Sequence, residues 1–201
     1  MRKTYVKVGG VWKACVSVWV RAGGVWKKDC IPHVRVGGVW KKCMEYFPDS
    51  VGDEYGGGIV AYLGSEGDFE NGMISAAEDT SEGYQWGCQG TTIGGDATGI
   101  AIGTGQKATT AIVAGCSTDS AAKLCDELSL NGYTDWFLPS ELELNELYQN
   151  KETIGGFSGP RYWSSSENSS RYARSQSFSL GGIDHFSKSY TFWRVRAVRG
   201  Y

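Results

Sequence analysis

Apolar residues recur at helical spacing in the stretch SAAKLCDELSL, which begins at Ser120. The positions that share one face of this helix are Ala122, Cys125 and Leu128. Asp119 or Thr118 is expected to cap its start, and Asn131-Gly132 is expected to end it, because Asn and Gly favour the left-handed backbone of a helix stop. The pattern therefore predicts an amphipathic helix between these two signals.

A second helix is predicted directly after DWFLP. Ser140 is followed three residues later by Glu143, the spacing of a capping box in which each side chain accepts a hydrogen bond from the backbone of the other residue. Its apolar positions are Leu142, Leu144, Leu147 and Tyr148, and helical periodicity is lost beyond them. Earlier, GIAIGTGQKATTAIVAG predicts a turn that leads into a short helix.

Two strands are predicted at the two ends of the same region. The apolar run GGGIVAYL, from Gly56 to Leu63, is typical of a buried strand. The last six residues before the terminal pair, RVRAVR, alternate between apolar and basic positions. Side chains of a strand alternate between its faces, so Val195 and Ala197 are expected on one face and Arg194 and Arg196 on the other.

The first 46 residues contain three copies of one short pattern. VKVGGVWK starts at Val6, VRAGGVWK at Val20 and VRVGGVWK at Val34. Each copy predicts two short strands around a Gly-Gly turn, since glycine adopts positive φ at no steric cost. The repeats form either a minor β-module packed on the main domain or an element for attachment and oligomerisation. They resemble the repeats of phage tail and tail-associated proteins.

Composition indicates one folded domain with a small appendage. The 201 residues are 41% hydrophobic and 21% charged, which predicts a packed core and excludes wholesale disorder. YFPDS, from Tyr46 to Ser50, is the expected boundary, so the domains are 1–46 and 51–201. A net charge of −2 gives no footprint for nucleic acid. No apolar stretch reaches the about 18 residues of a membrane span, and no signal peptide is expected.

Catalytic and metal-binding patterns are not expected in this chain. Gly103-Thr-Gly105 fits a loose dinucleotide fingerprint but lacks the surrounding βαβ alternation. The serines from Ser164 to Ser166 lack a nucleophile elbow, and acidic residues such as Glu78 and Asp79 are scattered and expected at a solvated surface. Six cysteines form no C-x-x-C pair, so reduced, buried thiols are expected. We therefore predict no enzyme activity, no cofactor and no metal.

The main domain resembles the Lcl C-terminal-type domain, a branch of the C-type lectin superfamily. The resemblance runs over about Val51 to Tyr201 and rests on DWFLPS with EL, on YWSSSE, and on the terminal RVRAVR. It implies an α+β fold with two helices and a twisted antiparallel sheet, whose ligand face lies on the C-terminal strands and loops. It also implies that Trp136 and Trp163 are core residues, and that Cys116 and Cys125 lie where family members carry cysteines, although their pairing would need an oxidising compartment.

The segment from Asn168 to Trp193 has an unusual composition. Serines, aromatic residues and glycines dominate it, as in an antibody paratope, where rigid aromatic side chains give contact area and serines adapt their hydrogen bonds. An AAC codon randomised at its adenines always ends in C and never encodes Lys, Gln, Glu, Met or Trp. Glu and Met are absent from the segment, and the exceptions are Gln176, Lys188 and Trp193. Those three positions are expected to be invariant or diversified through other codons.

This pattern resembles the variable region of diversity-generating retroelement target proteins. The fixed frame implied by the resemblance is Ala173, Gln176, Phe178, Gly181, Lys188 and Arg194 onward. The ligand-binding positions, expected to be mostly exposed on one face, are Asn168, Ser169, Ser170, Arg171, Tyr172, Arg174, Ser175, Ser177, Ser179, Leu180, Gly182, Ile183, Asp184, His185, Phe186, Ser187, Ser189, Tyr190, Phe192 and Trp193.

Two functions of different kinds follow from these observations. The first is a receptor-binding protein of a phage or prophage tail tip, which recognises a protein or glycan of the bacterial surface. It docks to tail proteins through the repeats, forms a homo-oligomer, with a trimer among the options, and resides on the virion or in the host cytoplasm before assembly. The second is a fixed lectin for sulfated glycans that uses Arg171, Arg174, Lys188, Arg194 and Arg196. A passive virion decoration is a third interpretation.

Overall fold

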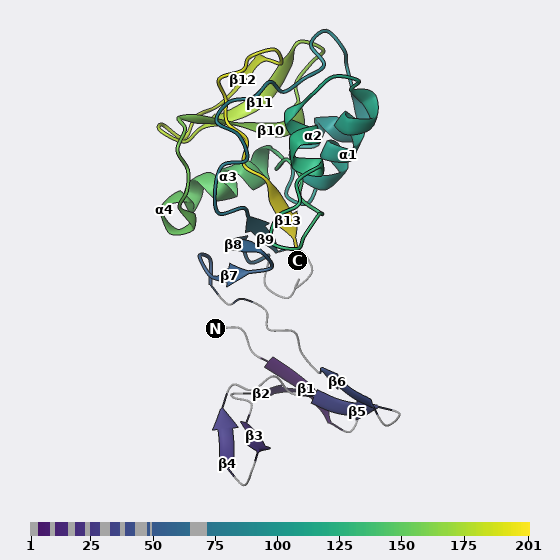
Figure 1. Cartoon of the computed structure of the whole chain (residues 1–201), viewed down its shortest axis with the longest axis vertical. Coiled ribbons are helices and arrows are strands. Elements are labelled where there is room, and N and C mark those ends of the chain that lie inside the picture. Colours follow the sequence, from purple (N-terminus) through teal and green to yellow (C-terminus); the bar gives the residue numbers. More distant parts are fainter. Residues whose placement is uncertain are drawn as a thin grey trace. The chain divides into compact units, whose positions relative to one another are not determined.

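The computed structural model describes residues 50–64 and 72–201 in full, together with Pro48 and the backbones of six strands within the first 42 residues. The chain divides into two compact units, Met1–Asp49 and Ser50–Tyr201 (Figure 1). The division falls inside the YFPDS segment. Each unit is described by itself below.

The six strands of the first unit form three antiparallel pairs. The pairs are β1 (Thr4–Val8) with β2 (Val11–Cys15), β3 (Trp19–Ala22) with β4 (Val25–Lys28), and β5 (His33–Val36) with β6 (Val39–Lys42). Each pair is a two-stranded sheet of its own. The strands fall on the sequence repeats as predicted, whereas the Gly-Gly pairs between them lie outside the described residues.

The second unit contains two antiparallel sheets at opposite ends, with a helix between them (Figure 1). One sheet has the strand order β13 (Val198–Gly200), β9 (Met73–Ser75), β8 (Gly58–Tyr62) and β7 (Glu54–Tyr55). The other has the order β10 (Arg161–Glu167), β11 (Tyr172–Ser177) and β12 (Ile183–Ser187). The predicted strand GGGIVAYL thus contains β7's partner β8, and the serine-rich segment forms most of the second sheet.

Four α-helices lie in the described part of the chain, one more than the sequence pattern predicts and two more than the family resemblance implies. They are α1 (Gly105–Gly115), α2 (Ala121–Asp126), α3 (Glu141–Gln149) and α4 (Lys151–Ile154), preceded by a 3₁₀ helix, η1 (Gly95–Thr98). The capping box of α3 is confirmed: the Ser140 hydroxyl accepts from Glu143 N–H, and the Glu143 carboxylate accepts from Ser140 N–H. The prediction missed α4, because this single turn after Asn150 is too short to show periodicity.

The boundaries predicted for α2 are wrong at both ends. Ser120 is the N-cap, since its hydroxyl accepts from Lys123 N–H at 3.1 Å. The helix ends at Asp126, and the expected stop at Asn131 and Gly132 instead forms a tight turn in which both residues have positive φ. Turn and helix stop need the same left-handed backbone, so the sequence signal alone does not separate them.

Three fully buried tryptophans define the main core. Trp136 and Trp163 are buried as predicted, and Trp86 joins them. The indole N–H of Trp163 donates to Tyr84 O at 2.8 Å, and that of Trp86 donates to Ser164 O at 2.8 Å. These bonds tie the segment around residue 85 to β10, the strand that carries the candidate site.

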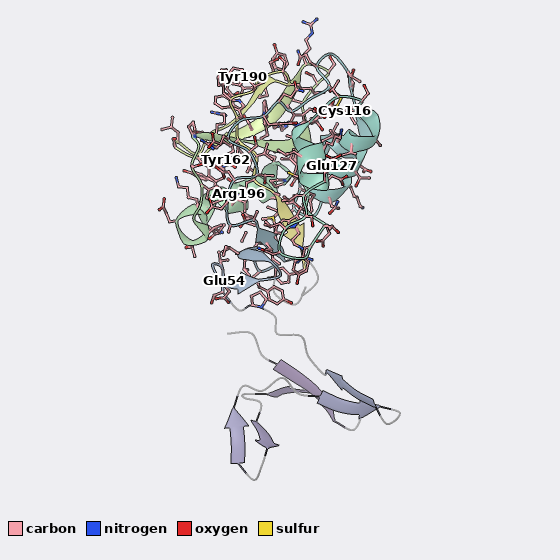
Figure 2. All side chains as sticks on the ribbon, viewed as in Figure 1. Glu54, Cys116, Glu127, Tyr162, Tyr190 and Arg196 are labelled. Atoms are coloured by element: carbon pink, nitrogen blue, oxygen red, sulfur yellow. A yellow bond between two sulfur atoms is a disulfide. The ribbon has the colours of Figure 1, made fainter. Side chains whose placement is uncertain are left out.

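The terminal RVRAVR segment departs from its predicted alternation. It forms isolated bridges rather than a strand up to Val198, and Arg196, which the lectin interpretation assigns to an anionic sugar, is fully buried. Its guanidinium donates to Asp79 Oδ1 at 2.8 and 3.1 Å and to Ala76 O at 2.7 Å. The expectation of a solvated Asp79 is therefore also wrong, because this carboxylate is the buried partner of Arg196, near Tyr162 (Figure 2).

The expectation of reduced thiols is wrong for two cysteines. Cys88 and Cys116 form a disulfide across 28 residues, which links the loop after Trp86 to the end of α1. Cys125 is free, and burial raises the pKa of its thiol, so it stays protonated. The other three cysteines lie outside the residues with described side chains.

No helix in the described part of the chain has both the length and the apolar character that a membrane crossing requires.

Candidate ligand-binding surface

The segment Asn168–Trp193 forms β11, β12 and the loops around them, at one end of the domain. Strand β12 is the edge of its sheet, because it pairs with β11 alone. The register sets Tyr172 opposite Ser187, Arg174 opposite His185, and Ser175 opposite Asp184. Tyr190 lies at this end of the domain and Glu54 at the other (Figure 2). An edge strand leaves the backbone N–H and C=O groups of its outer side without partners in the sheet.

Most of the twenty predicted ligand-binding residues reach the surface. Twelve are exposed, and this exposed set comprises Asn168, Arg171, Tyr172, Ser179, Leu180, Gly182, Ile183, Asp184, His185, Ser189, Tyr190 and Phe192. Six are half-buried: Ser169, Ser170, Arg174, Phe186, Ser187 and Trp193. That these residues contact a ligand stays a prediction.

Two of the predicted residues, Ser175 and Ser177, are buried. Ser175 lies opposite Trp163 of β10, and its hydroxyl accepts from Arg161 at 3.2 Å. The Ser177 hydroxyl accepts from Leu180 N–H at 3.0 Å, inside the turn that joins β11 to β12. Both hydroxyls serve the fold, so their placement on the ligand surface is wrong.

The expectation of a single exposed face is wrong as well. Ile183, Asp184 and His185 are consecutive residues of β12, and all three are exposed. Side chains of consecutive strand residues point to opposite faces of the sheet. The edge strand therefore offers two surfaces, one on each face.

The first surface carries the aromatic cluster, which we define as Phe186, Tyr190, Phe192 and Trp193. Tyr190 lies 4.8 Å from Trp193 and 5.2 Å from Phe192 between ring centroids. The guanidinium of Arg161, from β10, lies 4.8 Å from the Phe186 ring. Burial lowers the pKa of Arg161, partly offset by the charge of Asp184. An exposed group of rings beside a guanidinium is typical of the anchor points of a binding surface.

The second surface lies beside the first turn of α3. The ring of Tyr172 meets that of His185 edge-on at 5.6 Å. Arg174 Nη1 donates to Glu141 Oε2 at 2.8 Å, which holds this arginine against the helix. Glu141 and Arg161 both border the predicted segment without belonging to it. Sequence reasoning missed them, and only Arg161, directly before YWSSSE, has a position that points to the site.

Four buried side chains within the segment form what we call the framework residues: Ala173, Gln176, Phe178 and Lys188. Their exposed fractions range from 0 to 4%. All four were expected to be part of the fixed frame. Gln176 donates to Asn145 Oδ1 of α3 at 2.8 Å, and Phe178 packs against Tyr148, Phe157 and Tyr162. The segment is thus anchored to α3 and to a second cluster of buried hydrophobic residues, which contains Phe178, Tyr162 and Leu147.

Lys188 is the most deeply held of the framework residues. Its Nζ lies 2.5 Å from Glu167 Oε1, donates to Thr91 O at 2.8 Å, and lies 4.5 Å from the Trp86 ring centroid. The Glu167 carboxylate also accepts from the backbone N–H groups of Ile93 and Gly94, at 2.9 and 2.7 Å. Both charges are buried, and each makes further hydrogen bonds. The ion pair therefore holds the end of β10 and the residue after β12 against the loop that contains Thr91 and Gly94.

The five basic residues that the lectin interpretation assigns to the glycan differ in their exposure. Arg171 is exposed, and Arg174 and Arg194 are half-buried. Lys188 and Arg196 are fully buried in ion pairs with Glu167 and Asp79. These two residues are therefore unavailable to an anionic sugar, and that part of the prediction is wrong.

The three serines of YWSSSE lie inside the fold. Ser164, Ser165 and Ser166 are buried, and the hydroxyls of Ser164 and Ser166 donate to backbone carbonyls at 3.0 and 2.7 Å. Among residues 50–64 and 72–201, no group of three or more His, Cys, Asp and Glu side chains is placed to hold a metal ion.

The α+β fold with two antiparallel sheets is compatible with a lectin-like ligand-binding domain. The family model of the Lcl C-terminal domain matches residues 68–199, so the chain belongs to this family. The comparison with curated proteins found no match.

Proposed function

We propose that the chain is a receptor-binding protein whose surface at Asn168–Trp193 is diversified by a retroelement. It acts at the tip of a phage or prophage tail and recognises a protein or glycan of the bacterial surface. The proposal assigns binding and no catalysis to the domain. The diversified positions are the twelve exposed residues together with the half-buried Ser169, Ser170, Arg174, Phe186 and Ser187, and the framework residues stay constant.

One observation carries the proposal: the residues that adenine randomisation of AAC codons cannot produce are those that the fold holds. Within the segment, Gln176 and Lys188 are 1% and 0% exposed, and Trp193 is half-buried against the core. Diversification that spares these positions keeps the buried contacts on which stability depends. Trp193 accordingly belongs with the constant positions rather than with the diversified ones.

The arrangement also separates variation from stability. Substitutions at exposed positions change the free energy of unfolding by about 0.5 kcal/mol or less, whereas loss of a buried contact costs several times more. Leu180 is 88% exposed and Phe192 is 70% exposed, so many residue types fit there. A retroelement that rewrites such positions yields folded proteins with new surfaces.

The genetic test uses the DNA beside the gene. A near-copy of the sequence that encodes Asn168–Trp193 is expected there, with AAC or AAT codons at the exposed positions and a reverse transcriptase gene alongside. Codons for Gln176 and Lys188 are expected to be identical in both copies. Absence of both the near-copy and the reverse transcriptase gene would overturn the proposal that a retroelement diversifies this segment.

A binding test uses the assembled particle. Phe192→Ala removes the most exposed ring of the aromatic cluster, and removal of such an anchor typically weakens binding by about tenfold or more. Tyr133→Ala is the matched control. Tyr133 is also an exposed aromatic residue, with 37% of its surface accessible, but it lies beside β7 and β8 and outside the candidate surface. Adsorption to host cells should fall for Phe192→Ala alone. Equal adsorption of both variants would contradict receptor binding through this surface.

The N-terminal repeats are proposed to dock the chain to tail proteins and to assemble it into a homo-oligomer. Several copies multiply weak contacts through avidity. Sedimentation of the full chain measures its mass directly, and a trimer or another closed oligomer is the expected result. A monomer at all concentrations would contradict the oligomer.

A fixed lectin for sulfated glycans is the second candidate. The exposed Arg171 and the half-buried Arg174 and Arg194 favour it, since guanidinium groups offer paired donors to sulfate. Binding to heparin that weakens steeply with salt and is lost in Arg171→Ala, combined with a missing DNA near-copy, would establish it. No binding to cells or glycans would leave a passive decoration of the virion.

A further inference from the structure

The loop of residues 87–94 holds the first end of the candidate surface. Gly90 N–H donates to Ser170 O at 2.9 Å, and Gly94 N–H donates to Glu167 Oε2 at 2.7 Å. Glu167 is the last residue of β10, and Ser170 lies in the turn that leads from β10 into β11. The position of this turn therefore depends on the loop.

The same loop holds the second end of the surface, after β12. Gly87 N–H donates to Lys188 O at 3.2 Å, and Lys188 Nζ donates to Thr91 O at 2.8 Å. The hydroxyl of Ser187 donates to Gln89 Oε1 at 3.4 Å. One loop thus bonds to both segments that flank the exposed set.

A disulfide anchors this loop to the helices. Cys88 is bonded to Cys116, which directly follows the last residue of α1. The noncovalent bonds nearby are weaker anchors: Cys88 N–H donates to Thr118 Oγ1 at 3.4 Å, and Ala121 N–H donates to Gln85 O at 3.0 Å. Without the disulfide, the middle of the loop is held mainly by its hydrogen bonds to the two segments that flank the exposed set. These are the same segments whose position depends on the loop.

We propose that the Cys88–Cys116 disulfide is a redox switch that sets the order of the ligand surface. A dithiol reductant supplies two electrons and two protons and breaks the S–S bond. The products are the two cysteine thiols and the cyclic disulfide of the reductant. Cys88 is the more exposed of the two cysteines, since it is half-buried and Cys116 is buried. Residues 87–94 then lose their covalent anchor, and the turn at Glu167–Ser170 and the strand end at Lys188 loosen with it.

The consequence for binding rests on the proposed function. A preordered surface binds more tightly, because less conformational entropy is lost on contact. In a reducing cytoplasm, thiols stay reduced and the surface is loose. In an oxidising medium outside the cell the disulfide forms and locks the surface. The switch would hold back binding until the protein has left the cell in which it was made.

Hydrogen exchange on the full-length chain tests the switch without any ligand. The amides of Gly90, Gly94 and Lys188 report on the loop and on both ends of the surface, since their acceptors are Ser170, Glu167 and Arg171. Dithiothreitol should speed their exchange by about tenfold or more. The amides of Ala76 and Val198, bonded to Ala197 and Phe137, are the internal controls and should change little.

The double variant C88S/C116S sharpens the test. It should exchange like the reduced protein, and dithiothreitol should have no further effect on these amides. Unchanged exchange of Gly90, Gly94 and Lys188 on reduction would overturn the proposal. Faster exchange of all amides together, controls included, would also overturn it, because the disulfide would then serve general stability. A missing retroelement would refute the proposed function but leave this exchange result standing.

Discussion

Lys188 lies between Ser187 and Ser189 in the sequence, yet its side chain is fully buried while Ser189 is exposed and Ser187 is half-buried. The lysine bonds to Glu167 and Thr91, whereas the two serine hydroxyls lie 2.9 Å from each other near the surface. One short segment therefore carries two kinds of position. Stability resides in the framework residues, and the exposed set is free to change.

The largest expected effect comes from removing the buried lysine charge. Lys188→Met leaves the Glu167 carboxylate buried without its partner and should lower the free energy of unfolding by about 4 kcal/mol. Ser189→Met, one residue away, should change it by about 0.5 kcal/mol or less. Urea denaturation of the full chain measures both. Equal losses in the two variants would break the distinction between the two kinds of position.

Phe178 and Leu180 provide a second matched pair of apolar residues. Phe178 is 4% exposed and packs on the rings of Tyr148, Phe157 and Tyr162, so Phe178→Ala should cost about 3 kcal/mol. Leu180→Ala removes a side chain that is already in water and should cost about 0.5 kcal/mol or less. The denaturant midpoints of the two variants measure both losses of stability. A costly Leu180→Ala would show that the turn is part of the framework.

Alkaline pH tests the core beneath β11. Burial, and to a lesser extent the charge of Asp79, raises the pKa of Tyr162 to about 12. The unfolded phenol has a pKa of about 10, so stability from the neutral phenol is complete below pH 10 and falls as pH rises towards 12. The loss should be on the order of 2 kcal/mol. Unfolding measured from pH 8 to 12 should show this slope in the native chain, and a Tyr162→Phe variant with the same slope would contradict it.

The smallest effect is expected at the ion pair between Arg174 and Glu141. The Arg174 side chain is 37% exposed, and ion pairs at such sites contribute about 0.5 kcal/mol. Arg174→Ala should therefore lower the melting temperature only slightly. Arg196→Ala, which strands the buried Asp79, is the contrasting variant and should be strongly destabilised. A loss above about 2 kcal/mol for Arg174→Ala would move this residue into the framework.

Local signals in the sequence predicted local structure well. The capping box of Ser140 and Glu143 involves residues three positions apart, so the pattern contains all of the information. The frame of Ala173, Gln176, Phe178 and Lys188 followed from the family resemblance, and burial of these four side chains agrees with it. Composition and codon logic supplied the boundaries of the segment.

Long-range pairings were out of reach of the sequence. Lys188 meets Glu167 and Arg196 meets Asp79 only because distant strands and loops converge. For the same reason the sequence predicted reduced thiols and the resemblance pointed to Cys116 and Cys125, whereas the pairing of Cys88 with Cys116 depends on where α1 ends. Arg196 was misplaced because alternation assumes a regular strand, and this part of the chain forms single bridges.

The most direct test of the central claim is to sequence the gene region for Asn168–Trp193 in many cells of a population that carries it. We expect substitutions to concentrate at the exposed set, including Tyr172, Leu180 and Phe192, while Gln176 and Lys188 remain unchanged. Replacements should arise at positions where a template copy carries adenine. A uniform sequence across the population, or changes spread equally over buried and exposed positions, would contradict it.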